Sequence, residues 1–344
     1  MEGRCRTVDL GPPVLHRGSR VTGCALSSCV RLGEQRLDDA EGAEVREIVI
    51  VTDDAAALPA EWLEEHREGL AVVGMPVMVD DEALPLGEQK LPSSLLVALA
   101  EGRKVTTSRP SPGQFLRVYE QLAAHGYREI VSVHLSAELS GTVSSARIAA
   151  QSVDVPVTVI DTRTVAMDQG FGVMAAWEAA GSGADRDEIV AAARGHCGNT
   201  VLLYVPSLDQ LKRGGRLSPS IARLGTALQI KPLLGLKDGK LAPVEMPRTA
   251  AKARSRLVSL AVDALSRNGA DPGEENAGST HVEGAARPEV VIHHLADPDG
   301  ARELADELVQ AYRPDVRITI AEIPAVLAAH VGIGVRAVIV RTAP

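Results

Sequence analysis

Residues 47–54 read EIVIVTDD, and this short stretch decides the fold class. Its apolar residues are mostly β-branched and nearly continuous, which is typical of a parallel strand buried on both faces of a sheet. Residues 129–135 (EIVSVHL) and residues 155–161 (VPVTVID) repeat the same form. Strands of this kind that alternate with helical patterns predict an α/β domain with a mainly parallel sheet over residues 46–168.

The segment between the first two of these strands predicts a well-delimited helix. Ser111 is a good N-cap residue, Pro112 suits the first helical position, and Gln114 completes a capping box three residues after the cap. Gly126 is expected to end the helix. His134 and Met167, which lie beside strands, are interpreted as packing residues.

The second half of the chain alternates less regularly and predicts a second α/β domain with a mixed sheet over residues 169–344. Residues 237–240 (KDGK) form a good hairpin turn between two of its strands. The strand candidates of this half are residues 201–205, 230–236, 241–245, 290–295, 316–320 and 335–340.

Two segments lack apolar periodicity. Residues 1–45 are rich in glycine, arginine and serine, and we expect a disordered leader there. Residues 267–288 are rich in glycine, glutamate and asparagine, and we expect a mobile insertion within the second domain.

Composition narrows the classes of function. The formal net charge of −9 and the scattered lysines and arginines argue against a nucleic-acid-binding face. The sequence has no apolar run of about 20 residues, no signal peptide and no paired cysteine spacing for zinc or disulfides, so we expect a cytoplasmic protein without a metal. Aromatic residues make up only 2% of the 344 residues, so any apolar cavity is expected to have an aliphatic lining.

Four polar clusters lie at strand ends or in loops, where binding residues concentrate. Together they suggest an anion site, because hydroxyls and the backbone N–H groups of a helix start can donate hydrogen bonds to a carboxylate. The clusters are residues 105–112 (VTTSRPSP), 139–142 (LSGT), 211–217 (LKRGGRL) and 329–334 (AHVGIG).

In this order, the first three clusters resemble three motifs of the DegV family of bacterial fatty-acid-binding proteins. Asp53 after the first strand and residues 159–162 (VIDT) also match, as do residues 230–232 (IKP) and 244–249. The resemblance extends over about residues 46–340. It departs at Asp54, where the family usually has serine, and around His330, where valine and isoleucine replace two family residues.

The resemblance implies a function and a binding site. The chain would be a non-catalytic carrier that buries a long-chain fatty acid between its two domains, uses no cofactor and presents the carboxylate to a fatty-acid kinase. The implied fatty-acid-binding residues are Thr107, Ser108, Ser140, Gly141, Thr142, Arg216, Arg248 and His330. Around Arg213 and Arg216 we expect an exposed patch on which the kinase docks.

Other interpretations of the same residues stay open. Residues 106–112 and 140–142 also fit plain helix starts, residues 212–216 fit a solvated turn, and Arg216 and Arg248 could simply pair with carboxylates. The alternative functions are a serine-dependent lipid hydrolase and a small-molecule sensor. The sequence lacks the G-x-S-x-G nucleophile motif and the common phosphate-binding glycine motifs, which disfavours a hydrolase or a phosphotransferase.

Overall fold

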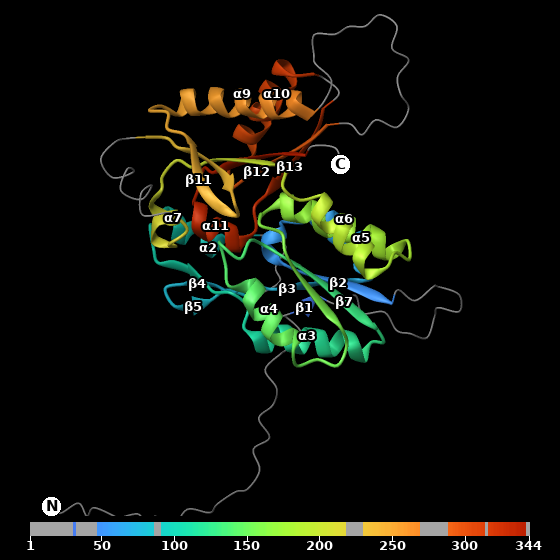
Figure 1. The fold of residues 1–344 in the computed structure, drawn as a ribbon. Helices are drawn as coiled ribbons and strands as arrows, with labels where there is room; N and C mark the ends of the chain where they lie inside the picture. The colour runs from blue at the N-terminus through green and yellow to red at the C-terminus, as the bar shows by residue number, and fades with distance from the viewer. Residues whose placement is uncertain are drawn as a thin grey trace, which may run out of the picture.

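The computed structural model describes residues 30–31, 47–85, 91–217, 230–268, 288–313 and 316–341. These residues form two main sheets that lie one above the other in Figure 1, with helices between them and outside them. The predicted fold class is confirmed, because the first sheet is mainly parallel and the second is mixed.

The first sheet contains the three strands that the sequence predicts most strongly. Four of its strands run parallel, and the short first strand pairs antiparallel with its neighbour. In spatial order they are β1 (Val30–Arg31), β3 (Leu70–Val73), β2 (Ile48–Asp53), β7 (Glu129–His134) and β8 (Val157–Asp161).

Helices cover both faces of this sheet, which explains the nearly continuous apolar strands. One face packs on α3 (Pro112–Ala124) and α4 (Thr142–Ala150), and the other on α5 (Met167–Gly181) and α6 (Arg186–Gly195). The predicted capping box at the start of α3 is present. The domain boundary at residue 168 stays a prediction, and the packing of α5 and α6 on the first sheet favours a later division, after residue 195.

The second sheet has six strands, and most of its neighbours are antiparallel. Only β12 and β13 run parallel to each other. In spatial order the strands are β11 (Lys240–Glu245), β10 (Leu233–Lys237), β9 (Thr200–Tyr204), β14 (Arg336–Arg341), β12 (Glu289–His294) and β13 (Arg317–Glu322). The predicted hairpin between β10 and β11 is confirmed, with positive φ at both Asp238 and Gly239, as a type I′ turn requires.

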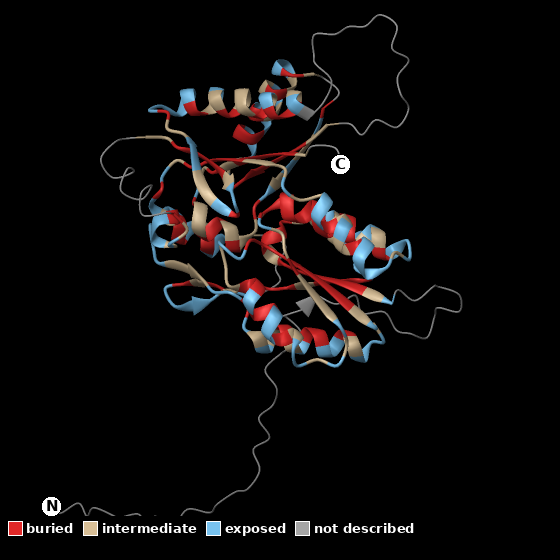
Figure 2. Cartoon of the chain, in the orientation of Figure 1, coloured by how far each residue is buried: buried red, intermediate tan, exposed pale blue. Residues whose placement is uncertain are grey.

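The two faces of the second sheet have different roles. The outer face packs on α9 (Ala250–Asn268) and α10 (Pro298–Ala311), whose exposed residues are pale blue in Figure 2. The inner face points toward the first domain. There α5 contributes Met167 and Phe171 to a small cluster with Val291 and Ile339 of the sheet. Helix α5 therefore lies between the two sheets and contacts both.

A third, three-stranded antiparallel sheet was not predicted from the sequence. Its strands have only two or three residues each, too few for a periodic apolar pattern. They are β5 (Glu82–Ala83), β4 (Val77–Val79) and β6 (Val105–Thr107). Side chains of β4 join an apolar cluster that includes residues of both main sheets' domains.

Five short helices complete the described part of the chain. They are η2 (Asp54–Ala56), α1 (Ala60–Glu65), α2 (Ser93–Ala100), α7 (Asp209–Arg213) and α11 (Ala325–Val331). Two of them, α2 and α11, contact the third sheet. Among the described helices, none is long and apolar enough to cross a membrane.

The predicted leader and insertion lie largely outside the described residues. Val30 and Arg31, within the predicted leader, pair with β3. The predictions for the rest of residues 1–45 and for residues 269–287 are left untested.

Candidate functional site

A pocket of about 930 Å³, part of it open to solvent, lies between the two domains. On one side it is lined by the loops at the carboxyl ends of the first sheet's strands, through Met75 after β3, Leu135 after β7 and Val165 after β8. This edge is where open α/β sheets commonly bind ligands. On the other side lies the inner face of the second sheet, with Leu203 and Ala337.

The body of the pocket is aliphatic, as the low aromatic content of the chain led us to expect. No phenylalanine, tyrosine or tryptophan is among the described residues that line the pocket. Aliphatic lining residues include Leu139, Val201, Leu211, Leu236, Val326 and Val335. Such a surface suits a flexible hydrocarbon chain better than a planar ring.

Two predicted site residues from different domains meet in the pocket. Thr107, the last residue of β6, lies with its Oγ1 2.8 Å from Nε2 of His330, near the end of α11. Gly214 makes room for the histidine ring, because a Cβ at this position would lie only 2.5 Å from Nδ1. Burial, and secondarily the charge of Arg216, lowers the pKa of His330 to about 4, so the ring is neutral at pH 7.

Ser140 lies just before α4 and lines the same pocket. Its Oγ is 2.9 Å from Oγ1 of Thr142, which is fully buried and does not line the pocket. Gly141 is the N-cap of α4 and carries no capping side chain. A Cβ at Gly141 would lie 2.5 Å from a guanidinium nitrogen of Arg109, so the glycine permits this arginine to lie against the helix start.

Arg216 provides a half-buried cation at the pocket. Its guanidinium donates to the carbonyl oxygens of Leu139, at 3.1 Å from Nε, and of Gly214. Burial lowers the pKa of this guanidinium. No carboxylate among the described residues forms an ion pair with it. An anionic ligand in the pocket would supply the missing countercharge.

The structure brings most of the predicted site residues together, but not all of them. Thr107, Ser108, Ser140, Arg216 and His330 line one pocket. Gly141 and Thr142 lie directly behind Ser140. Arg248 is exposed and is not a lining residue, so its role in binding stays a prediction that the pocket does not support. Arg213 is exposed and also outside the pocket lining.

The sequence did not single out two other polar residues of the pocket. Arg109 lies within the first polar cluster, but only the structure shows that it reaches the start of α4. His293 of β12 lines the pocket from the second sheet. Alternation along a strand places a residue on one of two faces, and no signal in residues 290–295 tells which face borders a cavity.

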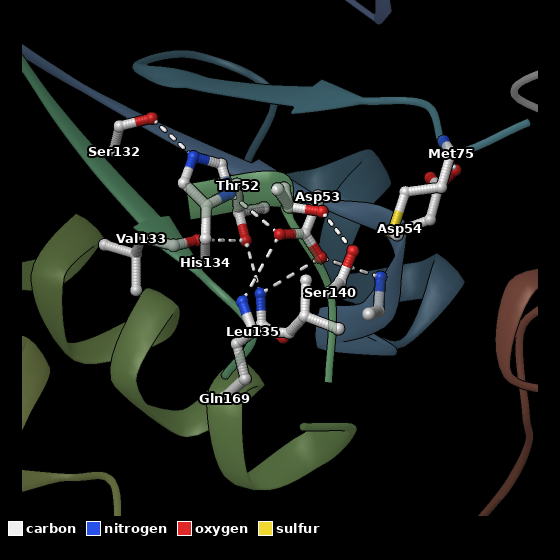
Figure 3. A network of polar contacts seen from close by, with 12 residues as sticks. Thr52, Asp53, Asp54, Met75, Ser132, Val133, His134, Leu135, Ser140 and Gln169 are labelled. Atoms are coloured by element: carbon white, nitrogen blue, oxygen red, sulfur yellow. Dashed lines mark hydrogen bonds and ion pairs between the residues drawn. The ribbon is translucent and has the colours of Figure 1, made fainter. Parts of the chain in front are cut away.

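A second polar cluster lies beside the pocket, in the core of the first domain (Figure 3). His134 Nδ1 is 2.7 Å from Asp53 Oδ2, and its Nε2 is 2.7 Å from Ser132 Oγ. Tyr119 is the last residue in this series of hydrogen bonds, with its hydroxyl 2.8 Å from Ser132 Oγ. Asp53 also accepts hydrogen bonds from the backbone N–H groups of Ala55 and Leu135.

This Asp–His–Ser chain does not form the active site of a hydrolase. Ser132, His134 and Asp53 are fully buried, and none of them lines the pocket. The Ser132 hydroxyl contacts Tyr119 and His134, and no substrate carbonyl could reach it. Because the cluster ties the ends of β2 and β7 together, it holds the loop that leads to Ser140. His134 is thus a packing residue, with its ring in edge contact with that of Phe115. It also forms hydrogen bonds with Asp53 and Ser132.

Among the described residues, no group of three or more histidine, cysteine, aspartate or glutamate side chains could hold a metal ion. The polar lining of the pocket instead consists of hydroxyls, two neutral imidazoles and two guanidinium groups. These features define a two-domain α/β protein with an interdomain pocket, which has an aliphatic body and a polar, cationic region that suits an anion.

Comparison with known proteins gives the family. Residues 47–343 match the family model described as "Uncharacterised protein, DegV family", and the chain belongs to the DegV family. A DegV domain-containing protein of Streptomyces coelicolor is 41% identical over 86% of this chain and 98% of its own length. One of Mycobacterium bovis is 32% identical over 83% of this chain and 94% of its own length.

Solved structures of the family share the fold. A fatty-acid-binding DegV family protein from Thermus thermophilus superposes with a TM-score of 0.72 at 30% identity. DegV from Bacillus subtilis, also described as a fatty-acid-binding protein, gives a TM-score of 0.72 at 27% identity. Each match covers 86% of this chain and 99% of the other.

Proposed function

We propose that this chain binds one long-chain fatty acid, with the carboxylate at Thr107, Ser140 and His330 and the tail in the aliphatic pocket. The observation that carries the proposal is the meeting of hydroxyls, a neutral imidazole and a guanidinium at the wall of an aliphatic cavity, where no described carboxylate pairs with the guanidinium. The relatives from Thermus thermophilus and Bacillus subtilis, described as fatty-acid-binding proteins, support it.

The polar cluster matches the needs of a carboxylate. An ionised carboxylate only accepts hydrogen bonds, and burying it without donors costs several kcal/mol. Thr107 and Ser140 supply hydroxyl donors, and the start of α4 adds backbone N–H groups and the positive end of a helix dipole. Arg216 and Arg109 add positive charge, which favours the ionised form of the acid.

The tail supplies most of the affinity. At about 0.8 kcal/mol for each buried CH₂ group, a sixteen-carbon chain gains on the order of 10 kcal/mol before ordering costs. The hydrogen bonds to the head group then fix the depth and direction of the chain. Head-group substitutions are therefore expected to weaken binding without abolishing it.

We further propose that the protein is a non-catalytic, cytoplasmic carrier that needs no cofactor and presents the carboxylate to a fatty-acid kinase. Ser108 and Arg109 are exposed and also line the pocket, so the proposed head-group position borders the surface. A partner enzyme could reach the carboxylate there while the tail stays buried. The exposed Arg213, three residues before Arg216, fits the proposed docking patch.

Binding is tested with Ser140→Ala and a matched control, Ser144→Ala, which alters an exposed serine of α4. A hydrogen bond to a charged acceptor contributes about 1.5–3 kcal/mol, so Ser140→Ala should weaken fatty-acid binding about tenfold or more. Ser144→Ala should bind as the wild type does. Equal affinity of all three proteins in a titration with a fluorescent fatty acid would leave Ser140 with only a structural role.

Presentation is tested by incubating loaded protein with ATP, with and without a bacterial fatty-acid kinase, and measuring acyl phosphate. Product is expected only with the kinase. Arg213→Glu should slow turnover, whereas the control Arg117→Glu, on the exposed side of α3, should not. Product without the kinase would make the chain an enzyme, and full turnover by Arg213→Glu would place the docking surface elsewhere.

A further inference from the structure

His293 lies in the second wall of the pocket, on the last of the strands that line it in the spatial order β11, β10, β9, β14 and β12. It belongs to β12 and pairs with Ala337 of β14, which in turn pairs with Leu203 of β9. All three residues line the pocket, so this row of side chains forms part of the inner face of the second sheet. Of the residues that the second sheet's strands contribute to the lining, only His293 has a polar side chain.

The imidazole of His293 is fully buried, and neither of its ring nitrogens makes a hydrogen bond to any described residue. The carbonyl oxygen of Ala321, on the neighbouring strand, lies near enough to favour a proton on the ring, but not in hydrogen-bonding geometry. Burial dominates and lowers the pKa of His293 to about 4, so the ring is neutral at pH 7. It therefore offers one donor and one acceptor.

Two other histidines of the chain show how unusual this state is. His134 is equally buried, yet Asp53 and Ser132 satisfy both of its ring nitrogens. His330 contacts Thr107. A buried polar group without a partner destabilises a protein, and in native structures it usually meets a ligand, an ion or water. The pocket, which His293 lines, is a space in which such a partner can lie.

We infer that His293 recognises an oxygen within the hydrocarbon part of the ligand, and that the protein prefers a fatty acid with a hydroxyl group on its chain. This inference rests on the proposed function. The carboxylate has its own partners at Thr107, Ser140 and His330, so His293 meets a part of the ligand beyond the head group. A hydroxyl can donate to the bare nitrogen or accept from the N–H of a neutral imidazole, so it suits whichever nitrogen the ligand meets.

A plain alkyl chain does not supply this contact. Methylene groups and carbon–carbon double bonds make no conventional hydrogen bond, so a simple saturated or unsaturated acid leaves the ring unsatisfied. The small side chain of Ala337, beside His293, leaves room on the pocket wall for a substituent of the chain. A keto group only accepts, so it should be favoured less than a hydroxyl.

The test uses delipidated full-length protein and a panel of octadecanoic acids with one hydroxyl at successive chain positions, with octadecanoic acid as reference. At least one positional isomer should bind about threefold to tenfold more tightly than the reference acid, as expected for one net hydrogen bond. In His293→Leu the order should reverse, because the same hydroxyl is then buried without a partner. His294→Leu, on the opposite face of β12, is the control and should keep the wild-type order.

Thermal unfolding of the ligand-free proteins checks that His293→Leu is folded. Its midpoint should equal or exceed that of the wild type, because leucine removes an unsatisfied polar group. If His293→Leu does not fold, His293→Gln, which keeps a donor and an acceptor, provides the comparison, and it should keep at least part of the preference.

The outcomes separate this inference from the proposed function. If octadecanoic acid binds and no hydroxylated isomer binds more tightly, His293 contacts only water, and the inference is wrong while the carrier function stands. A preference for the hydroxyl that persists in His293→Leu also overturns the inference. If none of the acids binds, both the inference and the proposed function fail.

Discussion

The Asp53–His134–Ser132 cluster and the Thr107–His330–Ser140 cluster contain similar residue types, yet the structure gives them different roles. The first is fully buried, and its members satisfy one another. The second is only partly buried and borders an aliphatic pocket, and beside it lies the cation of Arg216, which pairs with no carboxylate among the described residues. Serine and histidine alone therefore do not indicate a binding site. A binding site is indicated by polar groups that border a cavity and can still form hydrogen bonds or ion pairs with a ligand.

The largest effect is expected from a substitution that disrupts the first cluster. Asp53→Ala leaves His134 and the backbone N–H groups of Ala55 and Leu135 without their acceptor in a buried core. The free energy of unfolding should fall by about 3 kcal/mol or more in a urea titration. Asp306→Ala, at an exposed position of α10, is the control and should change it little. A loss below about 1 kcal/mol for Asp53→Ala would mean that the cluster does not hold the core together.

The same kind of substitution in the second cluster should affect binding instead of stability. Thr107→Val keeps the shape of the side chain but removes the hydroxyl that contacts His330. Fatty-acid affinity should fall about tenfold, while the free energy of unfolding changes by about 1 kcal/mol at most. Thr106→Val, next to it on β6 and outside the pocket lining, should leave affinity unchanged. A large loss of stability with unchanged affinity would assign Thr107 to the core.

Acid should lower the stability of the ligand-free protein, because the two pocket histidines are buried in their neutral form. Burial lowers the pKa of both His293 and His330 from 6.5 to about 4. At a pH between these two values, the unfolded chain therefore binds more protons than the folded chain. Stability is therefore fully present above pH 6.5 and is lost as the pH falls toward 4. Urea titrations across this range should show a smaller loss for His293→Leu. An identical pH dependence in wild type and variant would contradict the buried, neutral state of this ring.

The smallest expected effect concerns Ala166, which lines the pocket. Its backbone N–H donates a hydrogen bond to the carbonyl oxygen of Ala55, beside the first cluster. Its φ of 61° and ψ of −150° lie in a region that suits glycine. Ala166→Gly should raise the free energy of unfolding by up to about 1 kcal/mol. Ala179→Gly, within α5, should lower it by about the same amount. If both variants are destabilised equally in urea titrations, the backbone at Ala166 is not strained.

The sequence predicted those parts of the molecule that local patterns control. Residues 48–53 form a strand because apolar β-branched side chains fill both faces of the sheet, and Ser111 begins a helix because its own hydroxyl caps it. The polar clusters were found from their positions at strand ends and in loops, and the order of three of them matched the family's motifs. The third sheet escaped prediction because its strands are very short. His293 escaped because a sequence does not show which buried polar group lacks a partner.

The most direct test of the central claim is solvent extraction of the purified protein followed by mass spectrometry. If the pocket holds an acyl chain with its carboxylate at Thr107, Ser140 and His330, the extract should contain about one fatty acid per chain, because burial of the tail makes release slow. The same extraction of Ser140→Ala should recover less. A ligand-free extract from a folded protein that also fails to bind added fatty acids would contradict the account.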